Sequence, residues 1–367
     1  LAGGLEQAHL EQLAGGLVKA QRRLRVETPP AIGVASGAAG EVCPSMSSAM
    51  ILACGGCGQS YAIPVGCGRL RCESCSSDIA SKRAERKFNL FGGDGAALGA
   101  WVFTLPRQIG QAIGSLGARE LRKRVAWYLE QYYLDRWGII TGSVVSVHPE
   151  GDNRKGEWRP HFHVLLPLLG LDSSGPGLKA APAYLVAREL ELVKAGWLRL
   201  LQQAALELGI TDSMRVNLHY RYFDGGDSLK DSERRLRRAR AKKLHRMKYD
   251  FRPFPHWSAG EAGATRLLSP SSYGLLSGRA DRLVSEDRLE DLALWREVMQ
   301  GPELEEPVSR CDQVVDGVVC GCELEPKGVA VGARWRIEER YPGVRWRCGL
   351  MADEEQRARQ RGPPPAG

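Results

Sequence analysis

Long apolar segments are missing from this sequence, although 43% of its 367 residues are hydrophobic. A helix that crosses a membrane needs about 20 consecutive apolar residues, so we expect no membrane partner. The first residues also lack the basic and then apolar layout of a secretory signal. These two absences predict a cytoplasmic protein, in which ten cysteines are better explained as metal ligands or free thiols than as disulfides.

Histidine is scarce as well, with only seven in the chain, and no GxxxxGK[ST] phosphate-binding loop is present. The missing loop excludes an NTPase of the P-loop class. Positive charge is in modest excess, because 51 Lys and Arg stand against 43 Asp and Glu, for a net charge of +8. This balance favours a polyanionic partner.

Hydrophobic periodicity predicts an α+β arrangement in the middle of the chain. The predicted order is β-α-ββ-α-β followed by one more helix, which is typical of a ferredoxin-like (split βαβ) antiparallel sheet with helices packed on one face. The strands are expected at 101–105, 139–148, 159–169 and 214–223, and the helices at 118–138, 183–208 and 231–249. A zinc-ribbon-like module is expected before this sheet.

Composition divides the chain into five predicted parts. Ala- and Gly-rich residues open it, cysteines cluster next, and a charged tail ends it. The parts are a flexible segment (1–45), a zinc-binding module (46–90), the domain that contains the sheet (95–255), a helical extension (256–300) and a Cys-containing region with the tail (301–367).

The stretch RPHFHVLLP, residues 159–167, places two histidines at the mouth of an apolar strand. Alternate strand residues share a face about 6.6 Å apart, so His161 and His163 can converge on one metal ion. The structural alternative is a pair of histidines hydrogen-bonded at a strand end. As third ligand we favour His148, at the end of the partner strand, over Glu150 and Glu157 in the connecting loop.

Cysteine spacing predicts a structural zinc site near the amino terminus. The pattern CxxC-x14-CxxC is typical of zinc ribbons and comprises Cys54, Cys57, Cys72 and Cys75. Cys67 is a substitute within this set, and Cys43 stands outside it. The carboxy-terminal cysteines form either a second zinc site or free buried thiols, and they are Cys311, Cys320, Cys322 and Cys348.

Residues 234–248, RRLRRARAKKLHRMK, carry nine Lys and Arg and no acid. A solvated helix face is the plain interpretation. Like charges four residues apart destabilise a helix that has no partner, however, and phosphate is the natural partner for this one. The predicted DNA contacts are Arg237, Arg238, Lys242, Lys243 and Lys248.

Three segments together resemble the HUH endonucleases, which comprise rolling-circle replication initiators of plasmids and phages and the related single-strand tyrosine transposases. WVFTLP (101–106) is similar to their first strand, and residues 146–167 to their strand with a histidine, a hydrophobic residue and a histidine. KKLHRMKYDFRP (242–253) is similar to the helix with the nucleophilic tyrosine. The resemblance covers about residues 50–280.

The resemblance implies that Tyr249 is the catalytic nucleophile, with Tyr273 as the runner-up. His245 occupies the position of a second nucleophile one turn earlier, which favours the single-tyrosine subclass. The implied reaction is the nicking and joining of single-stranded DNA at an origin hairpin through a 5′-phosphotyrosine, with Mg²⁺ or Mn²⁺ at the histidines. Implied partners are a helicase and a polymerase of a bacterial or archaeal host.

Three other functions compete with a replication initiator. A tyrosine transposase of an insertion sequence would use the same chemistry on different DNA ends. A non-enzymatic zinc-ribbon DNA-binding protein would need its histidines only for structure. A histidine-triad nucleotide hydrolase is less favoured, because the third alternating position of the strand is Leu165.

Overall fold

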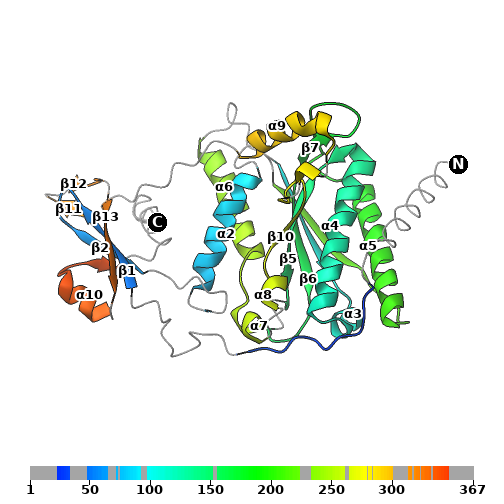
Figure 1. Ribbon diagram of the computed structural model, residues 1–367, viewed down its shortest axis with the longest axis horizontal. Helices are drawn as coiled ribbons and strands as arrows, with labels where there is room; N and C mark the ends of the chain where they lie inside the picture. The colour runs from blue at the N-terminus through cyan, green and yellow to red at the C-terminus, as the bar shows by residue number, and fades with distance from the viewer. Residues whose placement is uncertain are drawn as a thin grey trace, which may run out of the picture. The chain divides into compact units, whose positions relative to one another are not determined.

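A computed structural model divides the chain into two compact units (Figure 1). The first consists of Leu1–Val34 and Ala80–Pro302, and the second of Ala35–Ile79 and Glu303–Gly367. The structure describes residues 23–33, 48–64, 72, 75–91, 97–151, 155–223, 233–260, 264–278, 280–282, 284–300, 313–315, 318–322, 324–331 and 334–346.

The first unit is built on a five-stranded antiparallel sheet of order β10-β5-β6-β3-β9. In chain order these strands are β3 (Leu98–Thr104), β5 (Gly142–His148), β6 (His161–Pro167), β9 (Asn217–Phe223) and β10 (Ser271–Gly274). The α+β class and the antiparallel sheet predicted from the sequence are therefore confirmed.

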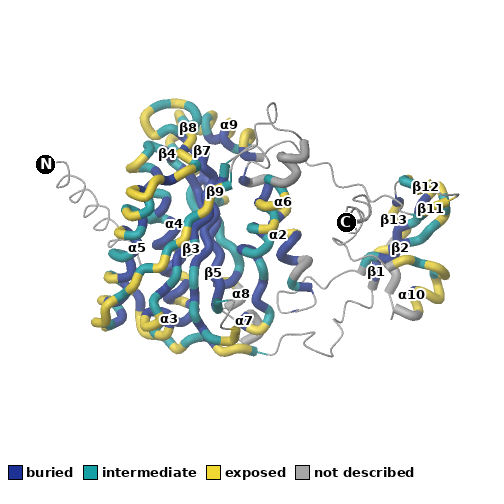
Figure 2. The backbone as a smooth tube through the Cα atoms, turned by 180° about the vertical axis from the view of Figure 1, so that it is seen from behind, coloured by how far each residue is buried: buried dark blue, intermediate teal, exposed yellow. Residues whose placement is uncertain are grey.

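Helices cover both faces of this sheet, where the sequence predicted one (Figures 1 and 2). On one face lie α4 (Ser115–Trp137) and α5 (Ala187–Leu208), and on the other lie α2 (Ser76–Leu90) and α6 (Glu233–Asp250). The reason is that the central strands are apolar on both sides. Val145 packs into the core with α4 and α5, whereas its neighbour Val144 packs into the core with α2 and α6.

The two helices of the first layer end as their sequences predict. Gly138 after α4 and Gly209 after α5 have left-handed backbones, with φ of 63° and 70°. Glycine adopts this conformation without strain, and it closes a helix by satisfying its last carbonyl groups.

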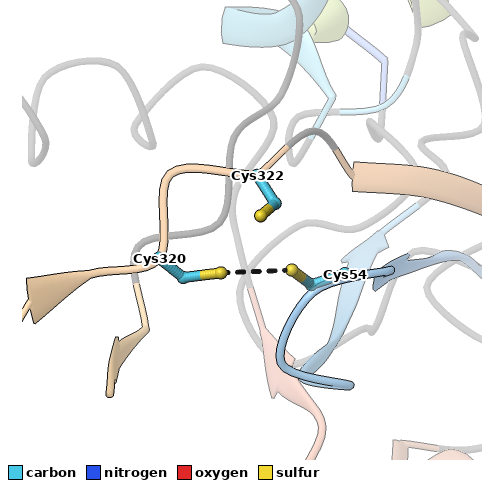
Figure 3. Close-up of side chains that lie close together, drawn as sticks. All are labelled: Cys54, Cys320 and Cys322. Carbon is cyan, nitrogen blue, oxygen red and sulfur yellow. Dashed lines mark hydrogen bonds between the residues drawn. The ribbon is translucent and has the colours of Figure 1, made fainter. Parts of the chain in front are cut away.

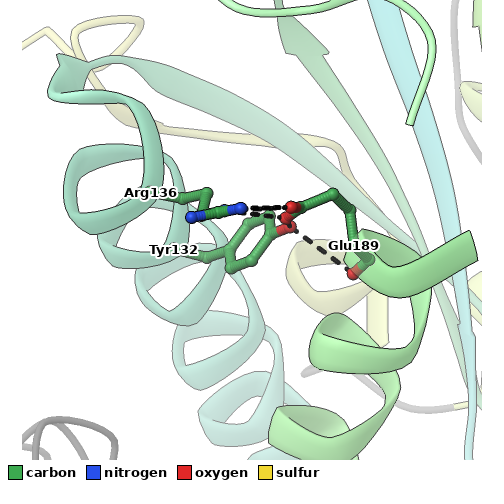
Figure 4. Close-up of polar contacts among 3 residues, drawn as sticks. All are labelled: Tyr132, Arg136 and Glu189. Atoms are coloured by element: carbon green, nitrogen blue, oxygen red, sulfur yellow. Dashed lines mark hydrogen bonds and ion pairs between the residues drawn. The ribbon is translucent and has the colours of Figure 1, made fainter. Parts of the chain in front are cut away.

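Polar contacts between side chains hold α4 and α5 together. Arg124 pairs with Glu207 at 2.9 Å. Nearer the end of α4, Glu189 accepts hydrogen bonds from Tyr132 at 2.8 Å and from Arg136 at 2.7 Å (Figure 4). These contacts stabilise the pair of helices that packs on this face of the sheet.

Several peripheral segments belong to the first unit. Leu24, within the predicted flexible segment, is only 3% exposed and donates its backbone N–H to Glu207 at 2.6 Å. The predicted helical extension contributes strand β10 next to β5. The remaining elements are α3 (Arg107–Ala112), β4 (Ile139–Ile140), β7 (Leu169–Asp172), β8 (Leu178–Ala180), α7 (Pro255–Gly260), α8 (Ala264–Leu267), η2 (Ala280–Arg282), η3 (Glu286–Arg288) and α9 (Leu289–Gln300).

The second unit joins two regions that the sequence analysis kept apart. Its sheet has the order β13-β1-β2-β14, and β13 from the carboxy-terminal region pairs with β1 from the amino-terminal one. The elements are β1 (Ser48–Cys54), β2 (Ser60–Pro64), β11 (Val314–Val315), β12 (Val318–Val319), β13 (Leu324–Val331), α10 (Arg334–Arg340) and β14 (Arg345–Trp346). Most of α2, predicted within the zinc module, belongs instead to the first unit.

None of the helices in the described part of the chain has the length and apolar character needed to cross a membrane.

Candidate metal and nucleophile site

Three histidines come together at the end of the β5–β6 hairpin. The register places His148 opposite His161, and His163 follows on the same face of β6. Their ring centroids lie 3.9 to 5.2 Å apart, and one nitrogen from each ring lies within 4.8 Å of the others. The predicted trio is thus a candidate metal-binding group.

The two alternative ligands are engaged elsewhere. Glu150 accepts a hydrogen bond from the Trp257 indole at 2.9 Å. Glu157 pairs with Arg159 at 2.8 Å. Neither belongs to a candidate metal-binding group among the described residues, whereas His148 does.

The face of the sheet that carries the histidines is the one covered by α6. Leu165 shares that face of β6 with His161 and His163, and it packs with Met247 and Phe251. His148 is fully buried and His163 is 3% exposed. The site is therefore largely shielded from water.

Each imidazole has one nitrogen oriented by an oxygen. Asp250 holds two of the rings: its side chain lies 2.6 Å from His163 Nδ1, and its backbone carbonyl lies 3.1 Å from His148 Nε2. The Arg159 carbonyl lies 3.3 Å from His161 Nδ1. A carboxylate or carbonyl that orients a metal-ligating histidine in this way is common in metal sites.

The tautomer of His148 follows from these contacts. A carbonyl oxygen can only accept a hydrogen bond, so Nε2 of His148 donates to Asp250 and Nδ1 of the neutral ring carries a lone pair. This buried Nδ1 has no hydrogen-bond partner in the structure as described. A metal ion would satisfy it.

Electrostatics favour a neutral His148. Burial, followed by the neighbouring His163, His161 and Arg252, lowers the pKa of His148 well below its usual value. A neutral imidazole is the form that binds metal. Burial also raises the pKa of Asp250 to about 7, although Arg246 opposes the shift through a 2.9 Å ion pair.

Tyr249 lies beside the histidines, near the end of α6. Its ring centroid is 5.3 Å from that of His148 and 5.5 Å from that of His163. The guanidinium carbon of Arg252 lies 4.3 Å from the centre of its ring. The fold therefore gathers the predicted nucleophile and the predicted metal ligands in one place.

The runner-up tyrosine is placed differently. Tyr273 on β10 pairs with Ser143, at the opposite end of β5 from His148. Five residues of strand span about 17 Å, so Tyr273 is remote from the histidine cluster. This placement favours Tyr249.

The basic residues of α6 separate into three groups. Lys242 is exposed and Lys248 is half-buried, so both are open to a phosphate. Lys243 is 2% exposed and enclosed by protein, and we withdraw it from the predicted DNA contacts. The side chains of Arg237 and Arg238 lie outside the described residues.

The predicted zinc ligands lie in two different places in the structure. Cys54 lies with Cys320 and Cys322 in one candidate metal-binding group (Figure 3). Cys72 and Cys75 pack with Ile79 in a separate cluster, so they are not among the cysteines that the structure groups with Cys54. Cys43, Cys67, Cys311 and Cys348 lie outside the described residues.

Two residues of the histidine site, Asp250 and Arg246, were missed by the sequence analysis. A signal for them existed: they stand four positions apart in a helix, the spacing at which side chains pair. Asp250 is also the first acid after the basic run and directly follows Tyr249.

Comparisons of the chain with protein-family models, with curated proteins and with solved structures find no match. The geometry of the site is therefore the basis for assigning a function.

Proposed function

We propose that the chain is a single-tyrosine HUH-type endonuclease that nicks and rejoins single-stranded DNA as a rolling-circle replication initiator. The observation that carries the proposal is the proximity of Tyr249 to two of the histidines. Its ring centroid lies 5.3 Å from that of His148 and 5.5 Å from that of His163. A nucleophile next to three convergent metal ligands is what this reaction needs.

The strand order gives further support. Between β5 and β9 the sheet runs β5-β6-β3-β9, and α4 and α5 follow β3 and β6 in the chain. This is the connectivity of a split βαβ sheet. We infer a ferredoxin-like core to which β10, α2 and α6 have been added.

His148, His161 and His163 would hold a divalent ion, Mg²⁺ or Mn²⁺. When bound, such an ion would polarise a non-bridging oxygen of the scissile phosphate and help to orient the group for attack. Asp250 positions two of the ligands from one residue, through its side chain and its backbone carbonyl. The fixed rings lower the entropic cost of binding the ion.

Tyr249 supplies the nucleophile. A tyrosine hydroxyl has a pKa near 10, so about one in a thousand is ionised at pH 7. The guanidinium of Arg252 lies 4.3 Å from the ring centre, which places positive charge against the phenol ring. The phenolic oxygen forms a bond to phosphorus, the bond to the 3′ oxygen breaks, and the proton lost by the phenol ends on the freed 3′-hydroxyl.

The test is formation of a covalent adduct between the purified protein and single-stranded, origin-like DNA in the presence of Mn²⁺. We expect Tyr249→Phe to abolish the adduct and Tyr273→Phe, the matched control, to retain it. An unchanged adduct in Tyr249→Phe would assign the nucleophile to another residue.

The same assay separates the competing functions. DNA binding without an adduct on any substrate would favour a non-enzymatic zinc-ribbon protein. A transposase differs from an initiator in the DNA ends it accepts, so a parallel assay on origin hairpins and transposon ends distinguishes them. We expect the faster reaction on the origin hairpin.

A further inference from the structure

Two short turns of the second unit present cysteines toward each other. The first turn joins β1 to β2 and is closed by backbone hydrogen bonds between Cys54 and Gln59, at 3.0 Å, and between Gly58 and Cys54, at 3.0 Å. The second follows β12, where the N–H of Cys320 donates to the Gln313 carbonyl at 2.8 Å. Each turn is thus held by its own backbone.

The sulfur atoms have the spacing of zinc thiolates. Cys54 Sγ lies 3.6 Å from Cys320 Sγ (Figure 3), and Cys322 Sγ lies within 4.8 Å of both. Four thiolates around zinc, each about 2.3 Å from the ion, are about 3.8 Å apart in a tetrahedron. A disulfide would need about 2.05 Å, so this pair is not one.

Cys57 is the fourth cysteine of the two turns. Its side chain interacts with the sulfurs of both Cys54 and Cys320. The backbone N–H groups of Cys57 and Gly56 face the Cys54 sulfur. Each turn thus contributes two cysteines.

Gly56 allows the two turns to approach. A β-carbon at this position would lie 2.7 Å from Cys322 Sγ and 3.4 Å from Cys320 Sγ. Real β-carbons do not come as close as the first of these distances, so any larger residue would push the second turn away. Glycine at position 56 is what the close approach of Cys320 and Cys322 to the first turn requires.

We propose that Cys54, Cys57, Cys320 and Cys322 bind one structural zinc ion that joins the amino-terminal and carboxy-terminal parts of the second unit. Thiolates select zinc among the common divalent ions, and a closed set of four leaves no position for catalysis. The ion would link Cys54 to Cys320, 266 positions further along the chain, next to the pairing of β1 with β13. This site is independent of the proposed nicking reaction.

The first test counts zinc per full-length chain by mass spectrometry in three variants. These are Cys54→Ser with Cys57→Ser, Cys320→Ser with Cys322→Ser, and all four changes together. We expect each double variant to lose the same single equivalent and the quadruple variant to lose no more. Full zinc in the Cys320/Cys322 variant, or a loss of two equivalents in the quadruple variant, would overturn the proposal.

Cys72→Ser with Cys75→Ser is the matched control. When these two changes are combined with Cys320→Ser and Cys322→Ser in one chain, we expect the zinc lost to equal the sum of the losses in the two double variants. The reason is that the two pairs belong to separate clusters. If the combined variant loses fewer zinc equivalents than this sum, Cys72 and Cys75 share the ion with Cys320 and Cys322, and the proposed ligand set is wrong.

A second measurement uses the unmodified chain, since a serine variant can fail to fold. Alkylation of each cysteine is followed by peptide mass spectrometry before and after removal of zinc with a chelator. We expect Cys54, Cys57, Cys320 and Cys322 to gain reactivity together, by at least about tenfold. Unchanged alkylation of Cys320 and Cys322, with protection lost only at Cys54 and Cys57, would contradict the proposal.

Discussion

The histidine cluster of the first unit takes all its ligands from one hairpin, whereas the cysteine cluster of the second joins residues 266 positions apart. The hairpin sets the histidine spacing through strand register alone. The cysteines meet only because β13 pairs with β1. A cluster of the first kind needs local structure, and one of the second kind needs the complete fold of its unit.

The surroundings of the two clusters differ as well. The histidines lie in a core beside buried charged groups, and Asp250 orients two of them. The cysteines lie on turns whose backbone amides face the sulfur of Cys54. We therefore expect loss of the histidines to affect both chemistry and the stability of the first unit, because Asp250 loses its buried partners, and loss of the cysteines to affect stability alone.

The largest effect should follow from His161→Ala combined with His163→Ala. Loss of the ion removes several kcal/mol of transition-state stabilisation, so we expect adduct formation to fall on the order of 1000-fold. Rates are measured with radiolabelled single-stranded DNA and Mn²⁺, at a temperature where thermal unfolding shows that the variant is folded. His245→Ala, exposed on the same helix as Tyr249, is the control and should keep its activity.

Asp250→Asn sharpens the comparison, because the cysteine cluster has no equivalent orienting side chain among the described residues. Loss of a group that orients metal ligands typically weakens metal binding by about 10- to 100-fold. We expect the Mn²⁺ concentration for half-maximal adduct formation to rise by this factor, with wild-type activity recovered at high Mn²⁺. A lower maximal rate at an unchanged Mn²⁺ requirement would indicate a different role for Asp250.

The pH dependence of stability should distinguish the two units. In the first, burial raises the pKa of Glu130 to about 8, while a hydrogen bond from Ser143 opposes the shift. The neutral acid is thus favoured in the folded state, and the stability it contributes is present below about pH 4.5 and lost as the pH rises through 8. The described part of the second unit contains no buried charged side chain.

Glu130→Gln should abolish the loss of stability at high pH, because glutamine does not ionise, and its amide can still hydrogen-bond to Ser143. At pH 9 we expect the first unit of the variant to be more stable than wild type on the order of 2 kcal/mol, and equally stable at pH 4.5. Urea unfolding at both pH values measures the difference. An identical difference at the two pH values would mean that Glu130 does not titrate in this range.

The smallest effect concerns the basic helix. If exposed Lys242 contacts phosphate, Lys242→Ala should reduce the slope of log affinity against log salt by about 0.7 for single-stranded DNA. Lys194→Ala on α5, where the ammonium pairs with Glu191 at 2.6 Å, is the control and should leave the slope unchanged. Binding is measured by fluorescence anisotropy across a salt series.

Local patterns explain which parts of the histidine site could be predicted. His161 and His163 alternate along one strand, and His148 ends the strand that pairs with it. The two-residue period of a strand and the hairpin register were therefore sufficient to predict that the three side chains lie close together. The position of Tyr249 followed from the resemblance. Asp250 was missed because its role depends on how α6 packs over the sheet, which no local pattern encodes.

Long-range pairing explains the two main differences between the predicted and the observed arrangement. The cysteine spacing suggested a ribbon formed from residues 54 to 75, but β13 brings Cys320 and Cys322 to Cys54 instead. The second helical layer was missed because α2 precedes β3 and α6 follows β9 in the chain, so neither connects two strands of the predicted split βαβ order. Both depend on contacts between segments far apart in sequence.

The most direct measurement is a crystal structure of the protein soaked with Mn²⁺, with data collected for the anomalous signal of manganese. We expect one peak about 2.1 Å from a nitrogen of each ring, with Nδ1 as the donor atom of His148 because Nε2 is held by Asp250. The phenol of Tyr249 should lie beside that peak. A soaked crystal with no manganese at His148, His161 and His163, or with Tyr249 turned away from it, would contradict the proposed nicking reaction.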